Sequence, residues 1–62
     1  MGADDIAFLR KQGTECRAME REAQLKADSA PTPEVRERWT AIAKEWRSLR
    51  ASVEELIALT AS

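Results

Sequence analysis

The chain has 62 residues and a net charge of −1, with 10 basic and 11 acidic side chains, which corresponds to one small domain, 1–62. A chain this short buries only about 60% of its unfolded surface, so its stability usually depends on disulfides, a metal or oligomerisation. Cys16 is the only cysteine and histidine is absent. An internal disulfide is therefore excluded, and neither a metal site nor a cofactor is expected. Oligomerisation remains, and a homodimer is the favoured form.

Residues 1–28 hold five basic and six acidic side chains, and residues 33–62 hold five of each. Neither half is a basic arm, so no nucleic-acid partner is expected. The single cysteine fits a cytoplasmic protein. The run MGADDIAFLRK lacks the basic and then apolar pattern of a signal peptide, and the longest apolar run, LIAL, is too short to span a bilayer. The C-terminal LIALTAS could touch a membrane surface, but no basic residue follows Arg50, which favours helix packing instead.

The first expected helix covers about 4–29. Asp4 or Asp5 can cap its N-terminus, and the helix ends before Ala30, because a residue that precedes proline is disfavoured in the α region. Gly13 lies inside this helix and costs roughly 1 kcal/mol relative to alanine, which suggests that another helix comes close there. One face collects the residues expected in the core or interface: Ile6, Leu9, Gly13, Cys16, Met19 and Ala23.

The second expected helix, about 33–60, carries the clearest signals. Thr32 fits the N-cap position, and Pro33 fits the first helical position, where its missing N–H has no cost. Apolar residues then recur at alternating spacings of four and three, which is an unbroken heptad seam. The seam residues expected in the core or interface are Val35, Trp39, Ile42, Trp46, Leu49, Val53 and Leu56.

The short connection between these helices predicts that they lie antiparallel. The fold class is therefore all-α, an antiparallel two-helix hairpin. Residues that face each other should have numbers that sum to about 62, which places Trp46 opposite Cys16 and Leu49 opposite Gly13. Large side chains then meet small ones, as close packing requires.

Two helices cannot enclose two tryptophans, each of which can bury on the order of 200 Å². Phe8, Ile57 and Leu59 add apolar surface outside the seam and are candidate intermolecular contacts. Exposed apolar surface of this extent is typical of an interface. We therefore expect two hairpins to pair as a coiled-coil-like four-helix bundle.

The runs ECRAMEREAQ and PTPEVRERWTAIAKEWRSL, between residues 15 and 49, resemble a widespread group of short, uncharacterised bacterial proteins common in alphaproteobacteria. The chain departs from that group's pattern at Leu9 and Gly13, where the group usually has an aromatic residue and an alanine. The resemblance implies a helical hairpin and no particular activity. The matching residues are Cys16, Arg17, Met19, Pro33, Glu34, Val35, Arg36, Ala43, Trp46 and Leu49.

Some of these residues have side chains that could also serve a chemical role. Cys16 lies in mid-helix on the apolar face with no histidine in the chain, so it is interpreted as a small core residue rather than a nucleophile. Trp39 and Trp46 could line a ligand groove, but successive heptad positions favour a core or dimer interface. The arginines are interspersed with glutamates and are expected to form a solvated, salt-bridged face. The paired carboxylates lack the Glu-x-x-His pattern of di-metal bundles, and no catalytic residue is expected.

The sequence thus favours a non-enzymatic module for self-association or protein interaction. The alternative is a regulatory adaptor that offers its Trp-lined seam to a helix of a partner protein.

Overall fold

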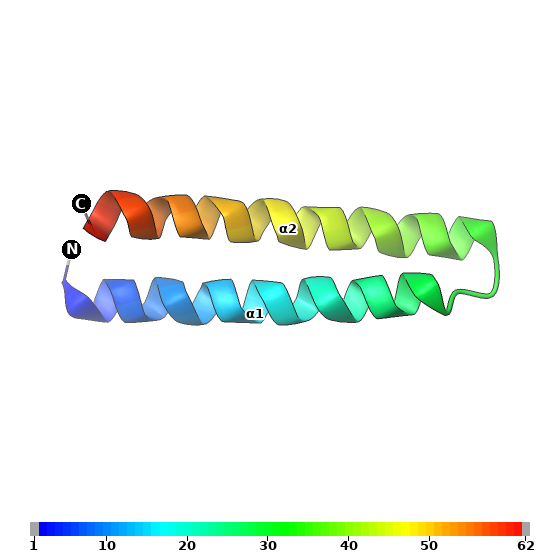
Figure 1. The fold of residues 1–62 in the computed structure, drawn as a ribbon, viewed down its shortest axis with the longest axis horizontal. Coiled ribbons are helices and arrows are strands. Elements are labelled where there is room, and N and C mark those ends of the chain that lie inside the picture. Colours follow the sequence, from blue (N-terminus) through cyan, green and yellow to red (C-terminus); the bar gives the residue numbers. More distant parts are fainter. Residues whose placement is uncertain (1, 62) are drawn as a thin grey trace.

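In the computed structural model, which describes residues 2–61, the chain forms two long antiparallel helices joined by a tight connection (Figure 1). Helix α1 spans Ala3–Asp28 and helix α2 spans Pro33–Ala61. The Cα trace measures 46 × 14 × 10 Å, and the described part of the chain holds no strand. The predicted all-α hairpin is confirmed.

The N-terminus of α1 begins earlier than predicted. Gly2 is the N-cap residue, so the prediction of Asp4 or Asp5 in that position is wrong. The backbone N–H of Gly2 donates to Oδ2 of Asp5 at 3.0 Å, and the N–H of Asp5 donates to the Gly2 carbonyl at 3.1 Å. Asp5 is the third helical residue, from which its carboxylate reaches back to the cap and also interacts favourably with the helix dipole.

The connection between the helices follows the sequence signals. The N–H and the hydroxyl of Ser29 donate to the Leu25 carbonyl at 3.2 and 3.1 Å, which closes the last turn of α1. Thr32 is the N-cap of α2, because its Oγ1 accepts a hydrogen bond from the Val35 N–H at 3.2 Å. Pro33 is the first helical residue. The predicted cap and start of the second helix are therefore confirmed.

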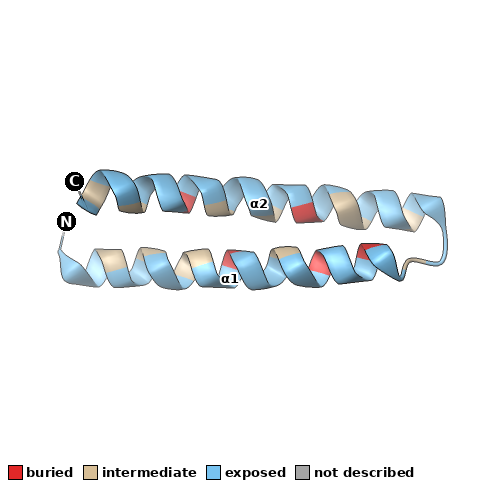
Figure 2. Cartoon of the chain, in the orientation of Figure 1, coloured by how far each residue is buried: buried red, intermediate tan, exposed pale blue. Residues whose placement is uncertain are grey.

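The core is a thin line between the two helices. Burial is confined to the sides of α1 and α2 that face each other, and most of both helices is exposed (Figure 2). Among residues 2–61 no buried side chain is larger than valine, so the helices can approach closely but remove little apolar area from water. The buried residues are Cys16, Ala23, Ala27, Ala43 and Val53.

The helix register differs by about one turn from the predicted one. A Cβ placed on Gly13 would lie 3.7 Å from Cγ1 of Val53, so Gly13 faces Val53 rather than Leu49. Side chains in a helix point toward its N-terminus. Side chains on α1 therefore tilt away from the turn, whereas those on α2 tilt toward it. A residue on α1 thus meets a residue on α2 that lies farther from the turn than itself. For this reason the residue numbers of contacting pairs sum to more than about 62. The close approach expected at Gly13 does occur, opposite a different residue.

Candidate interaction surface

Helix α2 meets α1 along a line that is rotated from the predicted seam. Six residues on this line are buried or half-buried and are spaced by four and three positions: Trp39, Ala43, Trp46, Arg50, Val53 and Ile57. The prediction included Trp39, Trp46 and Val53. It placed Ile42, Leu49 and Leu56 where the structure has Ala43, Arg50 and Ile57.

The displaced residues lie outside the hairpin contact. Ile42 is 36% exposed, Leu49 48% and Leu56 45%, and Met19 on α1 is 40% exposed. They were predicted to lie in the core or an interface, and they are not core residues of the hairpin, because two helices touch along one line and cannot cover a stripe as wide as the one on α2. Their role in an interface stays a prediction. The small Ala43 side chain lets α1 lie on the other side of that stripe.

The remaining predicted core residues do contribute to the hairpin contact. Cys16, Ala23 and Val53 are buried, and those that are half-buried are Ile6, Leu9, Gly13, Val35, Trp39 and Trp46.

The apolar residues left on one flank lie along one side of the hairpin, which we call the open face. Trp46 and Met19 lie at its centre, between two hollows of about 110 and 330 Å³. The smaller hollow is bordered by Trp39 and Ile42, and the larger by Leu49 and the otherwise buried Cys16. Phe8, 60% exposed, lies about three helical turns before Met19 on the same side of α1. The open face consists of Phe8, Met19, Trp39, Ile42, Trp46, Leu49 and Leu56.

A lysine limits the open face at the end near the turn. The Nζ atom of Lys26 lies 4.7 Å from the ring centroid of Trp39, a cation–π contact. It also pairs with Glu22 one turn earlier, at 3.6 Å. On α2 the exposed apolar region therefore runs from Ile42 toward the far end of the hairpin, with Leu49 near its middle.

The opposite flank of the seam is covered by charged side chains, which we call the ion cluster. Glu20 lies at its centre, with Oε2 3.3 Å from Nε of Arg47 and Oε1 3.4 Å from Nη2 of Arg50. The Glu20 side chain is only 16% exposed, and Oε1 is buried and makes an ion pair but no hydrogen bond. Arg17 and Arg50 both approach Glu54, each at 3.9 Å. The ion cluster consists of Arg17, Glu20, Arg47, Arg50 and Glu54.

The half-buried charges in the seam were missed by the sequence reasoning, although a signal existed. Gly13, Glu20 and Ala27 are seven apart on α1, and Ala43, Arg50 and Ile57 are seven apart on α2. Because the helices are antiparallel, Gly13 lies at the same end as Ile57, and Glu20 pairs with Arg50. Each line consists mainly of small or apolar residues with one central charge, and the two charges are opposite. Ile57 was expected outside the seam as a candidate intermolecular contact, but it lies in the seam, where it is half-buried and lines a shallow hollow with Gly13 and Arg17. Its intermolecular role stays a prediction. Phe8 and Leu59 are 60% and 68% exposed, and their intermolecular role stays a prediction.

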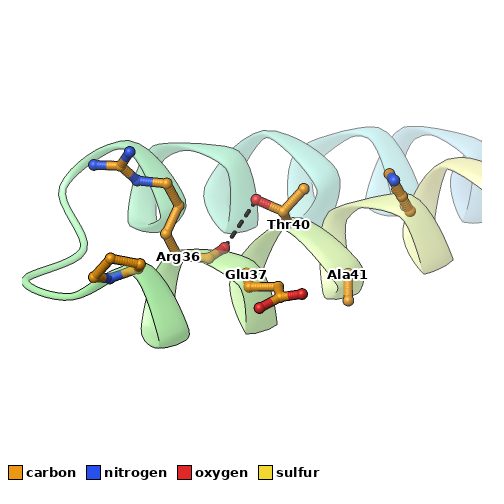
Figure 3. A pocket seen from close by; sticks show the side chains of 6 residues that line it. Arg36, Glu37, Thr40 and Ala41 are labelled. Carbon is orange, nitrogen blue, oxygen red and sulfur yellow. Dashed lines mark hydrogen bonds between the residues drawn. The ribbon is translucent and has the colours of Figure 1, made fainter.

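A further hollow lies on the outer side of α2 near the turn (Figure 3). Arg36, Glu37, Thr40 and Ala41 line it, and the Thr40 hydroxyl donates to the Arg36 carbonyl at 2.8 Å. All the lining residues come from α2 alone. One helix surface cannot enclose a ligand as binding pockets do, so we assign this hollow no role.

Across residues 2–61, no three His, Cys, Asp or Glu side chains gather where they could hold a metal ion. Neither described helix is long and apolar enough to cross a membrane. Comparisons with protein-family models, curated proteins and solved structures find no match to this chain. The open face is thus the surface on which the proposed function rests.

Proposed function

We propose that this protein is a non-enzymatic association module that pairs with a second copy through the open face. The observation that carries this proposal is the exposed stripe of Ile42, Leu49 and Leu56 on α2. These residues are seven apart, and a heptad spacing is what a long partner helix requires for continuous side-chain packing. The stripe remains uncovered after the hairpin has formed.

The surface area of the hairpin supports a partner of about its own size. The chain exposes 4854 Å², whereas a compact monomer of 7.0 kDa would expose about 4000 Å². The excess of about 800 Å² equals what each partner contributes to a stable protein interface. Covering the broad side of a 46 × 14 Å hairpin with a second copy would bury an area of this order.

The weakness of the core supports the same proposal. Three of the five buried residues are alanines, and burial is worth roughly 25 cal/mol per Å² of apolar surface. Such a core leaves little to offset the loss of conformational entropy on folding. Pairing would also complete the burial of the two half-buried tryptophans, Trp39 and Trp46. A cytoplasmic location is part of the proposal, since the one thiol is a free cysteine of the kind common in that compartment.

Sedimentation equilibrium of the reduced protein, from low micromolar to near-millimolar concentration, tests the proposal. We expect a dimer at the higher concentrations. Leu49→Glu should weaken association at least about 100-fold, because each copy would bury a carboxylate in the contact. Ala51→Glu introduces the same charge on the exposed side of α2 and should leave the dimer intact. Equal weakening by both variants would show that the open face is not the contact.

A regulatory adaptor that binds a helix of another protein is the second candidate. It is favoured by one observation, the two hollows beside Trp46, which could receive side chains of a foreign helix in the helix-in-groove manner. A helical wild-type monomer at every concentration would overturn self-association and make this the leading proposal. A tight dimer would argue against it, because the open face would already be occupied.

A further inference from the structure

We propose that the two copies pair through α2 against α2 in antiparallel orientation, with the twofold axis beside Leu49. This inference rests on the proposed function and adds the orientation of the partner. It follows from which helix carries the apolar stripe, from the charges beside that stripe, and from the ends of α2.

The two helices contribute unequally to the open face. On α2 the line with heptad spacing is apolar throughout: Ile42, Leu49 and Leu56. The corresponding line on α1 is polar except at Met19: Asp5, Gln12, Met19 and Lys26. Asp5 is engaged with the N-cap, and Lys26 lies over Trp39. A dimer that laid α2 on the partner's α1 would bury an apolar line against a polar one, whereas α2 on α2 buries two apolar lines against each other.

The charges beside the stripe decide the direction of the pairing. Arg38 and Glu45 lie one turn before Ile42 and Leu49. In a parallel pair each of these residues would lie level with its own copy, so that like charges would face each other. In an antiparallel pair centred on Leu49, Arg38 lies level with Thr60 of the second copy and Glu45 with Val53 of the second copy. No like charges then coincide.

The C-terminal turn of α2 provides a second argument for the antiparallel pair. That turn has no basic residue of its own, although positive charge there is stabilising because the end of the helix dipole is negative. The antiparallel arrangement brings Arg38 of each copy beside the C-terminal turn of the other. In the parallel arrangement, Arg38 of neither copy lies near a C-terminal turn of α2.

The α1 helices are compatible with the same axis. Gly13 faces Val53, so Leu49, one turn nearer the connection, is level with about residue 17 of α1. Rotation about the axis then brings Lys11 level with residue 23 of the second copy, next to Glu22. The charges on this side of α1 are thus opposite where they meet.

The larger hollow supplies a fit at the axis itself. It is lined by Cys16, Ala18, Met19, Trp46 and Leu49, together with the polar Gln12 and Glu15. Leu49 of the second copy, related by the axis, can enter it as a knob enters a hole. Ile42 then packs against Leu56 of the second copy on either side of the axis.

Disulfide cross-linking tests the orientation. In a Cys16→Ala background, Leu49→Cys should form a disulfide-linked dimer under mild oxidation, because residues at the axis lie within the Cα separation of about 4.4–6.8 Å that a disulfide needs. Ile42→Cys alone and Leu56→Cys alone should not cross-link, whereas an equimolar mixture of these two should. Ala51→Cys, on the exposed side of α2, is the control for random collisions.

The outcomes separate the two proposals. Cross-linking of Ile42→Cys alone and of Leu56→Cys alone would show a parallel pair and overturn the inference. The reduced variants could also sediment as dimers while neither Leu49→Cys nor the mixture of Ile42→Cys and Leu56→Cys cross-links. That result would overturn the α2 pairing but would still support self-association. A monomeric wild-type protein would overturn both.

Discussion

The two flanks of the interhelical seam have opposite chemistry. On one side Ile42, Leu49 and Leu56 are exposed, whereas on the other Glu20 is held between Arg47 and Arg50. The same two helices form both sides, so the difference comes from which residues flank the line of contact. The hairpin thus has one side that is open to a helical partner and one side on which ion pairs leave little apolar surface.

The comparison teaches that charge placement can limit an assembly. An amphipathic hairpin with two apolar flanks could add copies on both sides and grow without closing, whereas a single apolar flank favours a closed, twofold pair. The ion pair between Glu20 and Arg50 should contribute little net stability, because partly buried charges lose much of their mutual attraction to the cost of desolvation. Their effect is on which surface associates.

The largest expected effect is at Trp46, which lies at the boundary between the seam and the open face. Trp46→Ala should lower the free energy of unfolding by about 3 kcal/mol, at the low end for a large aromatic residue because Trp46 is only half-buried. Thermal unfolding at fixed protein concentration, followed by circular dichroism, measures it. Leu25→Ala, at a residue that is 59% exposed, should change stability by less than about 0.5 kcal/mol. A Trp46→Ala melt within a few degrees of wild type would show that the indole belongs to neither contact.

The ion cluster comes next. Glu20→Leu alone should cost about 1–2 kcal/mol, because it leaves Arg50 partly buried without its partner. The double change Glu20→Leu with Arg50→Leu should recover most of that loss and create a second apolar flank. We therefore expect species larger than a dimer in sedimentation velocity. A strictly dimeric double variant would show that the ion cluster does not limit assembly.

Arg17→Ala with Glu54→Ala is the control for this variant. This pair belongs to the same cluster, but its side chains are 72% and 57% exposed. Exposed ion pairs are worth about 0–1 kcal/mol, so we expect little change in stability and none in assembly.

Substitutions at Gly13 test the packing inside the seam, where we expect a smaller effect and, for alanine, a gain in stability. Gly13→Ala should stabilise the protein by about 0.5–1 kcal/mol, since alanine is the better helix former and its Cβ would meet Val53 at an ordinary contact distance of 3.7 Å. Gly13→Leu should destabilise the hairpin, because the added atoms have no room between the helices. Chemical denaturation of both variants measures the two signs. Stabilisation by leucine would mean that the helices do not approach closely at this residue.

Added salt should have the smallest effect on stability, and it should distinguish the ion cluster, which salt screens, from the open face, which it does not. At 1 M NaCl, where the screening length is about 3 Å, the exposed ion pairs weaken. We expect hairpin stability to fall by a few tenths of a kcal/mol and the dimer dissociation constant to change by less than about threefold, because apolar contact is not screened. A dimer that dissociates in salt would indicate that charged side chains, not the open face, hold it together.

Much of the fold was predictable, because its signals are local. Thr32 and Pro33 mark the start of the second helix by their own chemistry, and the heptad spacing identifies an amphipathic helix without knowledge of its partner. The cap at Gly2 was not predicted because aspartate is favourable both as the N-cap residue and as the third residue of a helix. Only the backbone conformation shows that Asp5 is the third helical residue and that Gly2 is the N-cap.

The position of the helix contact was not predictable in the same way. The apolar stripe on α2 is wide enough for two partners, and the sequence does not say which side α1 covers. Glu20 and Arg50 were expected on a solvated, salt-bridged face because arginines and glutamates are interspersed along the chain. Their partnership depends on a register that side-chain tilt shifts by about one turn.

The alanine-rich core has a thermodynamic consequence. Alanine loses no rotamer freedom on burial, so ordering Ala23, Ala27 and Ala43 has little entropic cost, and their small apolar area contributes little to the heat capacity of unfolding. Larger apolar side chains, among them Ile42, Leu49 and Leu56, are exposed on the open face. Most of the heat-capacity change of this protein should therefore appear when two copies separate rather than when a hairpin melts, and calorimetry of dilution would show it as a temperature-dependent enthalpy of dissociation.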